Sequence, residues 1–115
     1  MNRFDGLEID QTLEDALSNL NDVGFKKATA KAKLDHLNEQ KKVVKASLMN
    51  QAELNGVNTI SAQEKHALDN DVYREHLVLT HEAQKKYLDL EHSYTMLELR
   101  IGVWRTIQAS IRQGI

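Results

Sequence analysis

The chain has 115 residues, enough for one small domain, and it contains no proline, the commonest internal breaker of helices. Its hydrophobic fraction of 41% and charged fraction of 28% are typical of a folded chain and exclude a membrane-like or disordered one. No apolar run approaches the roughly 20 residues of a membrane span, and the N-terminus lacks the apolar core of a secretory signal. We therefore expect a soluble, cytoplasmic protein that does not bind membranes.

Charge is distributed unevenly, although the formal net charge is only −2. Residues 1–22 carry one basic and six acidic residues, whereas residues 23–52 carry seven lysines and two acidic residues. Such segregation can direct docking and the choice of partner. The absence of cysteine excludes disulfides, thiolate metal sites and thiol catalysis.

The first predicted element is a short helix over about residues 11–23, which Asp10 can cap. Its apolar face consists of Leu13, Ala16, Leu17 and Leu20. A helix of this length is marginal alone and must dock on another surface. Gly24 is typical of a helix end or a hinge. We therefore predict an acidic N-terminal arm with a short helix at residues 1–24 and a helical hairpin domain at residues 25–115.

A second helix is predicted over about residues 25–54. Five apolar residues fall on alternating steps of three and four, with Lys27, Lys41 and Gln51 filling the gaps in the pattern. They are Ala30, Leu34, Leu37, Val44 and Leu48. Asn55 and Gly56 then favour a left-handed helix end and a reversal of the chain.

Ser61 and Glu64 form a capping-box pattern, in which each side chain would satisfy a free backbone N–H. We therefore expect a short helix over about residues 62–68. The Asp-Asn-Asp sequence at residues 69–71 can interrupt it, and a long helix is predicted from there over about residues 71–112.

The long helix carries one stripe that we call the main seam. Alternating steps of three and four pass through Tyr73, His76, Thr80, Ala83, Tyr87, Leu90, Tyr94, Leu97, Ile101, Trp104, Gln108 and Ile111. Nine of these twelve residues are apolar or aromatic, and such spacing keeps one face of a helix against a partner helix. The predicted fold is all-α: an elongated, coiled-coil-like antiparallel hairpin with a short N-terminal helix, dimerising into a helical bundle.

A second apolar stripe occupies the C-terminal third of the long helix, on a face that the spacing puts roughly opposite the main seam. It consists of Met96, Leu99, Val103 and Ile107. Either the N-terminal helix or a second copy of the chain can cover it, and we expect a homodimer in which both contribute. The predicted oligomer interface consists of Met96, Leu99, Val103, Trp104, Ile107 and Ile111.

No pattern indicates a catalytic, cofactor-binding or metal site, so we do not expect an enzyme. His81 and Glu82 begin the zinc motif H-E-x-x-H, but Lys85 stands where the second histidine is needed. The serines lack a recognisable nucleophile turn. His76 on the main seam is interpreted as a polar residue that fixes helix register, or alternatively as a pH-sensitive interface residue.

The lysines of the second helix favour an alternative function in nucleic-acid binding. Phosphate contacts require only positive charge, and the candidate residues are Lys31, Lys41, Lys42 and Lys45. This segment contains no arginine and no interleaved aromatic residues for base stacking, so a solvated helix face also explains it. A further alternative is that the acidic arm mimics DNA and inhibits a host factor.

Four short runs together resemble small helical proteins encoded in phages and prophages. They are residues 37–46 (LNEQKKVVKA), 62–64 (AQE), 73–77 (YREHL) and 104–106 (WRT), and the resemblance covers about residues 34–112. Genes of that type often lie among recombination and replication functions. The resemblance implies an accessory protein that binds another protein in DNA metabolism or host takeover, and it implies no catalytic residues.

Overall fold

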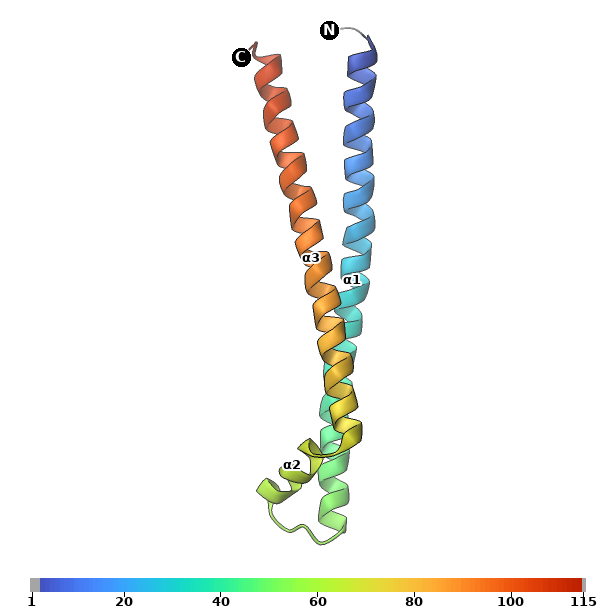
Figure 1. The fold of residues 1–115 in the computed structure, drawn as a ribbon, viewed down its shortest axis with the longest axis vertical. Coiled ribbons are helices and arrows are strands. Elements are labelled where there is room, and N and C mark those ends of the chain that lie inside the picture. Colours follow the sequence, from blue (N-terminus) through green and yellow to red (C-terminus); the bar gives the residue numbers. More distant parts are fainter. Residues whose placement is uncertain (1–2, 115) are drawn as a thin grey trace. The chain divides into compact units, whose positions relative to one another are not determined.

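The computed structural model describes the backbone of residues 3–114 and the side chains of residues 11–114. Within that range the chain forms three helices and no strand: α1 (Arg3–Leu54), α2 (Ile60–Leu68) and α3 (Asp71–Arg112) (Figure 1). The predicted all-α fold is therefore confirmed. None of these three helices has the length and apolar character needed to span a membrane.

The chain divides into two compact units. Unit 1 contains Met1–Thr29 and Leu88–Ile115, and unit 2 contains Ala30–Tyr87. In unit 1, Gly24 of α1 lies beside Tyr94 of α3; in unit 2, Leu34 and Leu37 of α1 pack with Ala83 of α3. Within each unit, α1 and α3 therefore run antiparallel, which confirms the predicted helical hairpin.

The predicted helix break at Gly24 is wrong, because α1 continues through this residue. The spacing of α1 explains why. Residues 13, 16, 20, 23, 27 and 30 follow uninterrupted alternating steps of three and four, so one face stays against α3 on both sides of the glycine. The predicted N-cap at Asp10 concerns a side chain outside the described residues, and the backbone there already belongs to α1.

Gly24 has a packing role instead. A Cβ added to it would lie 3.0 Å from Cε2 of Tyr94, so the missing side chain makes room for the tyrosine ring. The Lys27 ammonium lies 4.8 Å from the centre of the same ring, which is a cation–π distance. The glycine therefore permits a close approach between α1 and α3 within unit 1.

The connection from α1 to α2 follows the predicted turn, but the cap of α2 differs. Gly56 has φ +94°, the left-handed conformation expected after a helix end. The helix then begins at Ile60, and the Thr59 hydroxyl accepts a hydrogen bond from the Ala62 N–H at 3.2 Å. Ser61 is therefore not the cap, because threonine two residues earlier already takes that role.

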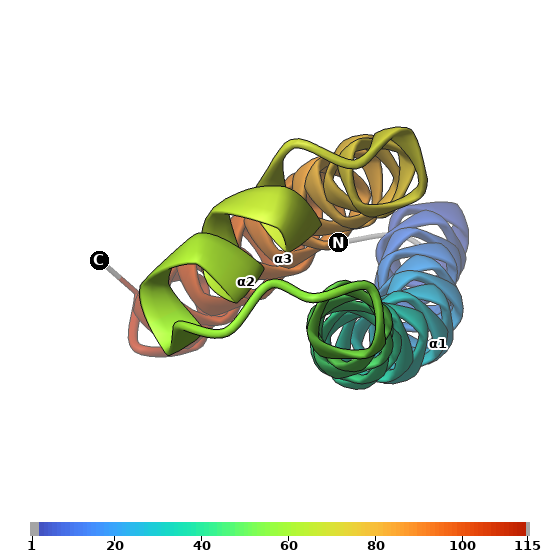
Figure 2. The same cartoon turned by 90° about the horizontal axis from the view of Figure 1, so that it is seen from below.

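Unit 2 has two small apolar clusters. One joins Leu34, Leu37 and Ala83, with Tyr87 packed against it. The second brings together all three helices through a larger set, Leu48, Ala67 and Tyr73 with Val44, Met49 and Leu77 at its edge. Figure 2 shows α2 beside the end of α1 and the start of α3.

Polar contacts also fix α2. Gln63 is buried and its side-chain amide donates to the Val57 carbonyl at 2.8 Å, while Glu64 accepts from the Lys45 ammonium at 2.8 Å. The predicted interruption at residues 69–71 is confirmed, because α2 ends at Leu68 and α3 begins at Asp71. Asn70 caps α3 by accepting the Val72 N–H at 2.9 Å.

Candidate functional site

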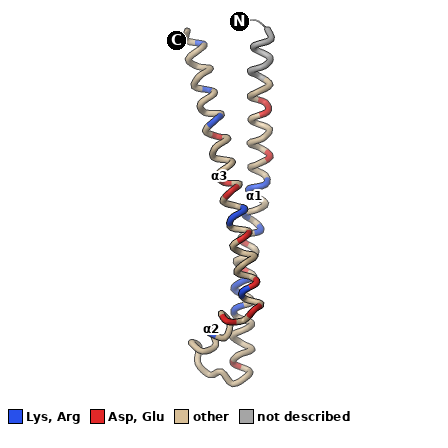
Figure 3. The backbone as a smooth tube through the Cα atoms, in the orientation of Figure 1, with Lys and Arg blue, Asp and Glu red and all other residues tan. Residues whose placement is uncertain are grey.

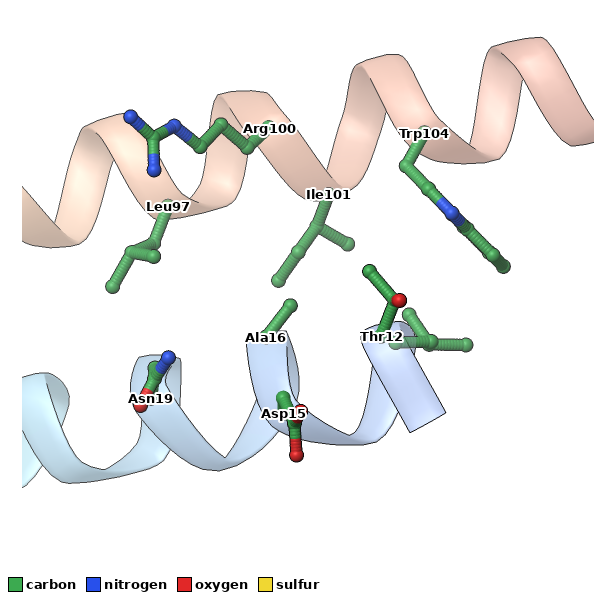
Figure 4. Close-up of a pocket in the computed structure, with 9 residues that line it drawn as sticks. Thr12, Asp15, Ala16, Asn19, Leu97, Arg100, Ile101 and Trp104 are labelled. Carbon is green, nitrogen blue, oxygen red and sulfur yellow. The ribbon is translucent and has the colours of Figure 1, made fainter. Parts of the chain in front are cut away.

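The candidate site is a groove within unit 1, where the first part of α1 faces the last part of α3. It has a volume of about 300 Å³. The lining residues are Thr12, Leu13, Asp15, Ala16 and Asn19 from α1 and Leu97, Arg100, Ile101 and Trp104 from α3. Figure 4 shows Leu97, Ile101 and Trp104 directed towards α1, and Ala16 and Thr12 directed towards α3.

The groove arises from unequal side chains on its two walls. Most of the α1 residues are small or polar, whereas α3 contributes large apolar ones, so the helices meet at Ile101 without filling the space around it. Ile101 is buried and Trp104 is half-buried. Towards the start of α1 and the end of α3 the two helices diverge (Figure 1). Ile111, which we placed on the main seam, is exposed there.

The N-terminal part of α1 covers the main seam and leaves the second apolar stripe open. The N-terminal helix is one of the two elements predicted to cover that stripe. Its groove-lining residues, between 12 and 19, face Leu97, Ile101 and Trp104 instead. The stripe is solvent-exposed, with exposed fractions of 41% for Met96, 56% for Leu99, 59% for Val103 and 52% for Ile107. At about 100° per residue, the stripe lies roughly 120° around α3 from the main seam, on a flank rather than opposite.

The six predicted interface residues therefore fall into two groups. Trp104 is half-buried in the groove, and the other five are exposed on α3. Large exposed apolar side chains grouped along one helix mark interaction surfaces in soluble proteins. Sequence reasoning missed the polar edge that α1 gives the groove. Thr12, Asp15 and Asn19 follow one another at helical spacing, a pattern visible in the sequence once α1 is recognised as continuous.

The four candidate nucleic-acid-binding lysines lie along α1 in unit 2, where Figure 3 shows a mixture of basic and acidic positions. Lys31 pairs with Asp35 at 2.7 Å, Lys42 with Glu39 at 3.2 Å and Lys45 with Glu64 at 2.8 Å. Lys41 is half-buried against the hairpin. Three of the four charges are thus already matched by carboxylates of this chain.

Two of these lysines have altered acidity. The hydrogen bond to Glu64 raises the pKa of Lys45 above its ordinary value of 10.5, and the hydrogen bond to Asp35 does the same to the pKa of Lys31. Lys31 also lies 5.7 Å from the centre of the Tyr87 ring. Both side chains therefore remain cationic over the whole physiological range, with their charges directed at groups of their own chain.

The histidines are not assembled into a site by the described residues. Within residues 11–114, no group of three or more His, Cys, Asp or Glu side chains is placed to hold a metal ion. His76 is half-buried on the main seam, and its Nδ1 has no hydrogen-bond partner among the described groups. Its backbone carbonyl accepts the Thr80 hydroxyl at 2.7 Å, a local bond within α3.

Comparisons of the chain with protein-family models, with curated proteins and with solved structures found no significant match. The groove and the exposed stripe are therefore interpreted from their own geometry and charge.

Proposed function

We propose that this chain is a non-enzymatic interaction protein that acts as a homodimer and binds a further protein through its helical surface. The observation that carries this proposal is the exposed stripe of Met96, Leu99, Val103 and Ile107 on α3. Burying such side chains against a partner removes apolar surface from water, which stabilises the complex by roughly 25 cal/mol per Å² of buried area. A helix flank of this kind is suited to a second helix, not to a small substrate.

The groove beside the stripe also favours binding over catalysis. Its lining contains no histidine, cysteine or serine, and its two charged residues, Asp15 and Arg100, are both exposed. Catalytic groups commonly lie in enclosed pockets where burial and neighbouring charges shift their pKa. The groove offers an apolar floor for packing and charged edges for specificity.

The resemblance to phage and prophage proteins supplies the biological setting of the proposal. On that basis the chain is an accessory protein in DNA metabolism or host takeover, working in the cytoplasm of the host cell. Nucleic-acid binding by the lysines of α1 is the less favoured function, because Lys31, Lys42 and Lys45 each pair with a carboxylate of the same chain.

Light scattering after size exclusion tests the dimer and its surface together. We expect the wild-type chain to have twice its monomer mass at tens of micromolar, and Val103→Asp to run as a monomer with unchanged helical circular dichroism. Val78→Asp is the matched control, because Val78 is also on α3 and is 56% exposed, compared with 59% for Val103. It should remain dimeric.

Two results would contradict the proposal. If the wild-type chain stays monomeric at hundreds of micromolar, the proposed homodimer is wrong. A Val103→Asp chain that dimerises as tightly as Val78→Asp shows that the stripe is not the interface.

A further inference from the structure

The exposed flank of α3 contains one charged residue within its apolar stripe. Met96, Arg100, Val103 and Ile107 follow steps of four, three and four, the spacing with which a helix face contacts another helix. Arg100 is exposed and makes no ion pair among the described residues. The flank therefore presents apolar side chains around an unmatched positive charge.

The groove beside this flank has the complementary arrangement. Arg100 lines one edge of it and Asp15 lines the other, with Leu97, Ile101 and Trp104 between α3 and α1 (Figure 4). Asp15 accepts a hydrogen bond from the Gln11 amide at 3.0 Å but forms no ion pair among the described residues. The groove thus has an apolar floor between Arg100 on one edge and Asp15 on the other, and neither forms an ion pair among the described residues.

A second α3 flank placed in the groove would satisfy both surfaces. Its apolar side chains would lie on the floor, and its Arg100 would approach Asp15 on the far edge. Because a twofold axis repeats every contact, one such arrangement covers the groove and the flank of both copies. The surface is self-complementary, which favours a second copy of this chain over an unrelated helix.

The register of the helices agrees with this pairing. In unit 1, Gly24 lies beside Tyr94 and Ala16 lies beside Ile101, so Asp15 is level with about Val103. In an antiparallel pair that sets Met96 against the partner subunit's Ile107, the partner subunit's Arg100 comes level with Val103. The packing of the apolar residues and the charge pair therefore require the same register.

We propose that two copies of this chain dimerise through antiparallel contact of their α3 flanks, with the Arg100 of each copy paired to the Asp15 of the other. This inference rests on the proposed function, since it specifies the geometry of that homodimer. The charge pair fixes register and partner choice more than it adds affinity, because exposed ion pairs contribute little to stability.

Charge reversal tests the pairing. Asp15→Arg alone gives two arginines at each contact, and Arg100→Glu alone gives two carboxylates, so each variant should dimerise about tenfold more weakly than wild type. An equimolar mixture of the two variants restores opposite charges at both contacts of a mixed dimer. Light scattering should therefore show wild-type-like dimerisation of the mixture. Lys26→Glu, a reversal elsewhere on α1, should leave the dimer unchanged.

Introduced cysteines test the direction of the helices, since the chain has none of its own. After mild oxidation, a mixture of Met96→Cys and Ile107→Cys chains should form mainly the disulfide between residue 96 and the partner's residue 107. Dominant cross-links between identical positions would overturn the antiparallel arrangement. Equal weakening of the single reversals and of their mixture would overturn the charge pairing. Either result, with Val103→Asp still monomeric, would leave the proposed homodimer intact.

Discussion

Gly24 lies inside α1 and Gly102 inside α3, and the surroundings of these two glycines differ. Gly24 faces the Tyr94 ring, where an added Cβ would be 3.0 Å away, whereas nothing lies within 4 Å of a Cβ added to Gly102. Glycine in a helix interior is destabilising by about 1 kcal/mol relative to alanine, because it loses more conformational freedom on folding. Of these two positions, Gly102 is the one where an alanine meets no close neighbour.

We therefore expect Gly102→Ala to raise the free energy of unfolding by about 0.5 to 1 kcal/mol. Gly24→Ala should gain less or lose stability, because its methyl group displaces Tyr94. Urea unfolding followed by circular dichroism measures both variants. Equal gains at the two positions would mean that the ring moves aside and that the close approach at Gly24 is not required.

At the residue scale, the main seam could be predicted because its spacing is determined by helix geometry alone. Tyr73, Thr80, Ala83 and Ile101 are buried as expected for that seam. The role of Glu64 could not be predicted. From the sequence alone, its carboxylate could either cap the start of the short helix or pair with a lysine of another helix. The fold decides between them: Thr59 caps α2, and Glu64 pairs with Lys45 from α1.

At the scale of elements, both limits of α3 and the reversal after Leu54 follow from capping residues and glycine. The continuity of α1 does not follow from Gly24 itself, because the low helix propensity of glycine favours a helix end there. Six positions of α1, four before Gly24 and two after it, follow alternating steps of three and four. Packing along that face outweighs a cost of about 1 kcal/mol. Apolar residues that keep the same helical spacing across a glycine are therefore strong evidence that the helix continues. A single glycine is weaker evidence that the helix ends.

The pair between Lys45 and Glu64 connects α2 to α1 and is partly buried. Lys45→Gln should therefore lower the melting temperature of the chain at pH 7. Since the hydrogen bond to Glu64 raises the pKa of Lys45 above 10.5 in the folded chain, this stabilisation is fully present below that pH. It is lost as the pH rises through the folded-state pKa.

Thermal unfolding at a series of pH values measures this effect. The difference in melting temperature between wild type and Lys45→Gln should hold from pH 7 to about pH 10 and then shrink. Lys42→Gln is the control, because its pair with Glu39 joins residues of one exposed helix turn. A similar decrease in melting temperature in both variants would contradict this prediction. It would show that the pair between α2 and α1 stabilises the chain no more than a pair within one exposed helix turn.

At the scale of the whole molecule, the sequence predicts the apolar stripe but does not predict which partner covers it. A stripe of side chains specifies which face a helix buries, and any apolar helix satisfies it equally. The structure places Asp15 and Arg100 on opposite edges of one groove. Our proposal that a second copy of the chain covers the stripe rests on this charge pair and on the register that it shares with the apolar residues.

The emission of Trp104 tests the central claim most directly, because it is the only tryptophan and it lies in the groove. If a second copy covers this surface, the emission maximum should shift to shorter wavelength as the wild-type concentration rises from submicromolar to tens of micromolar. The maximum of Val103→Asp should stay constant over the same range. A wild-type maximum that does not change while the measured mass doubles would contradict the account, because the dimer would then form through another surface.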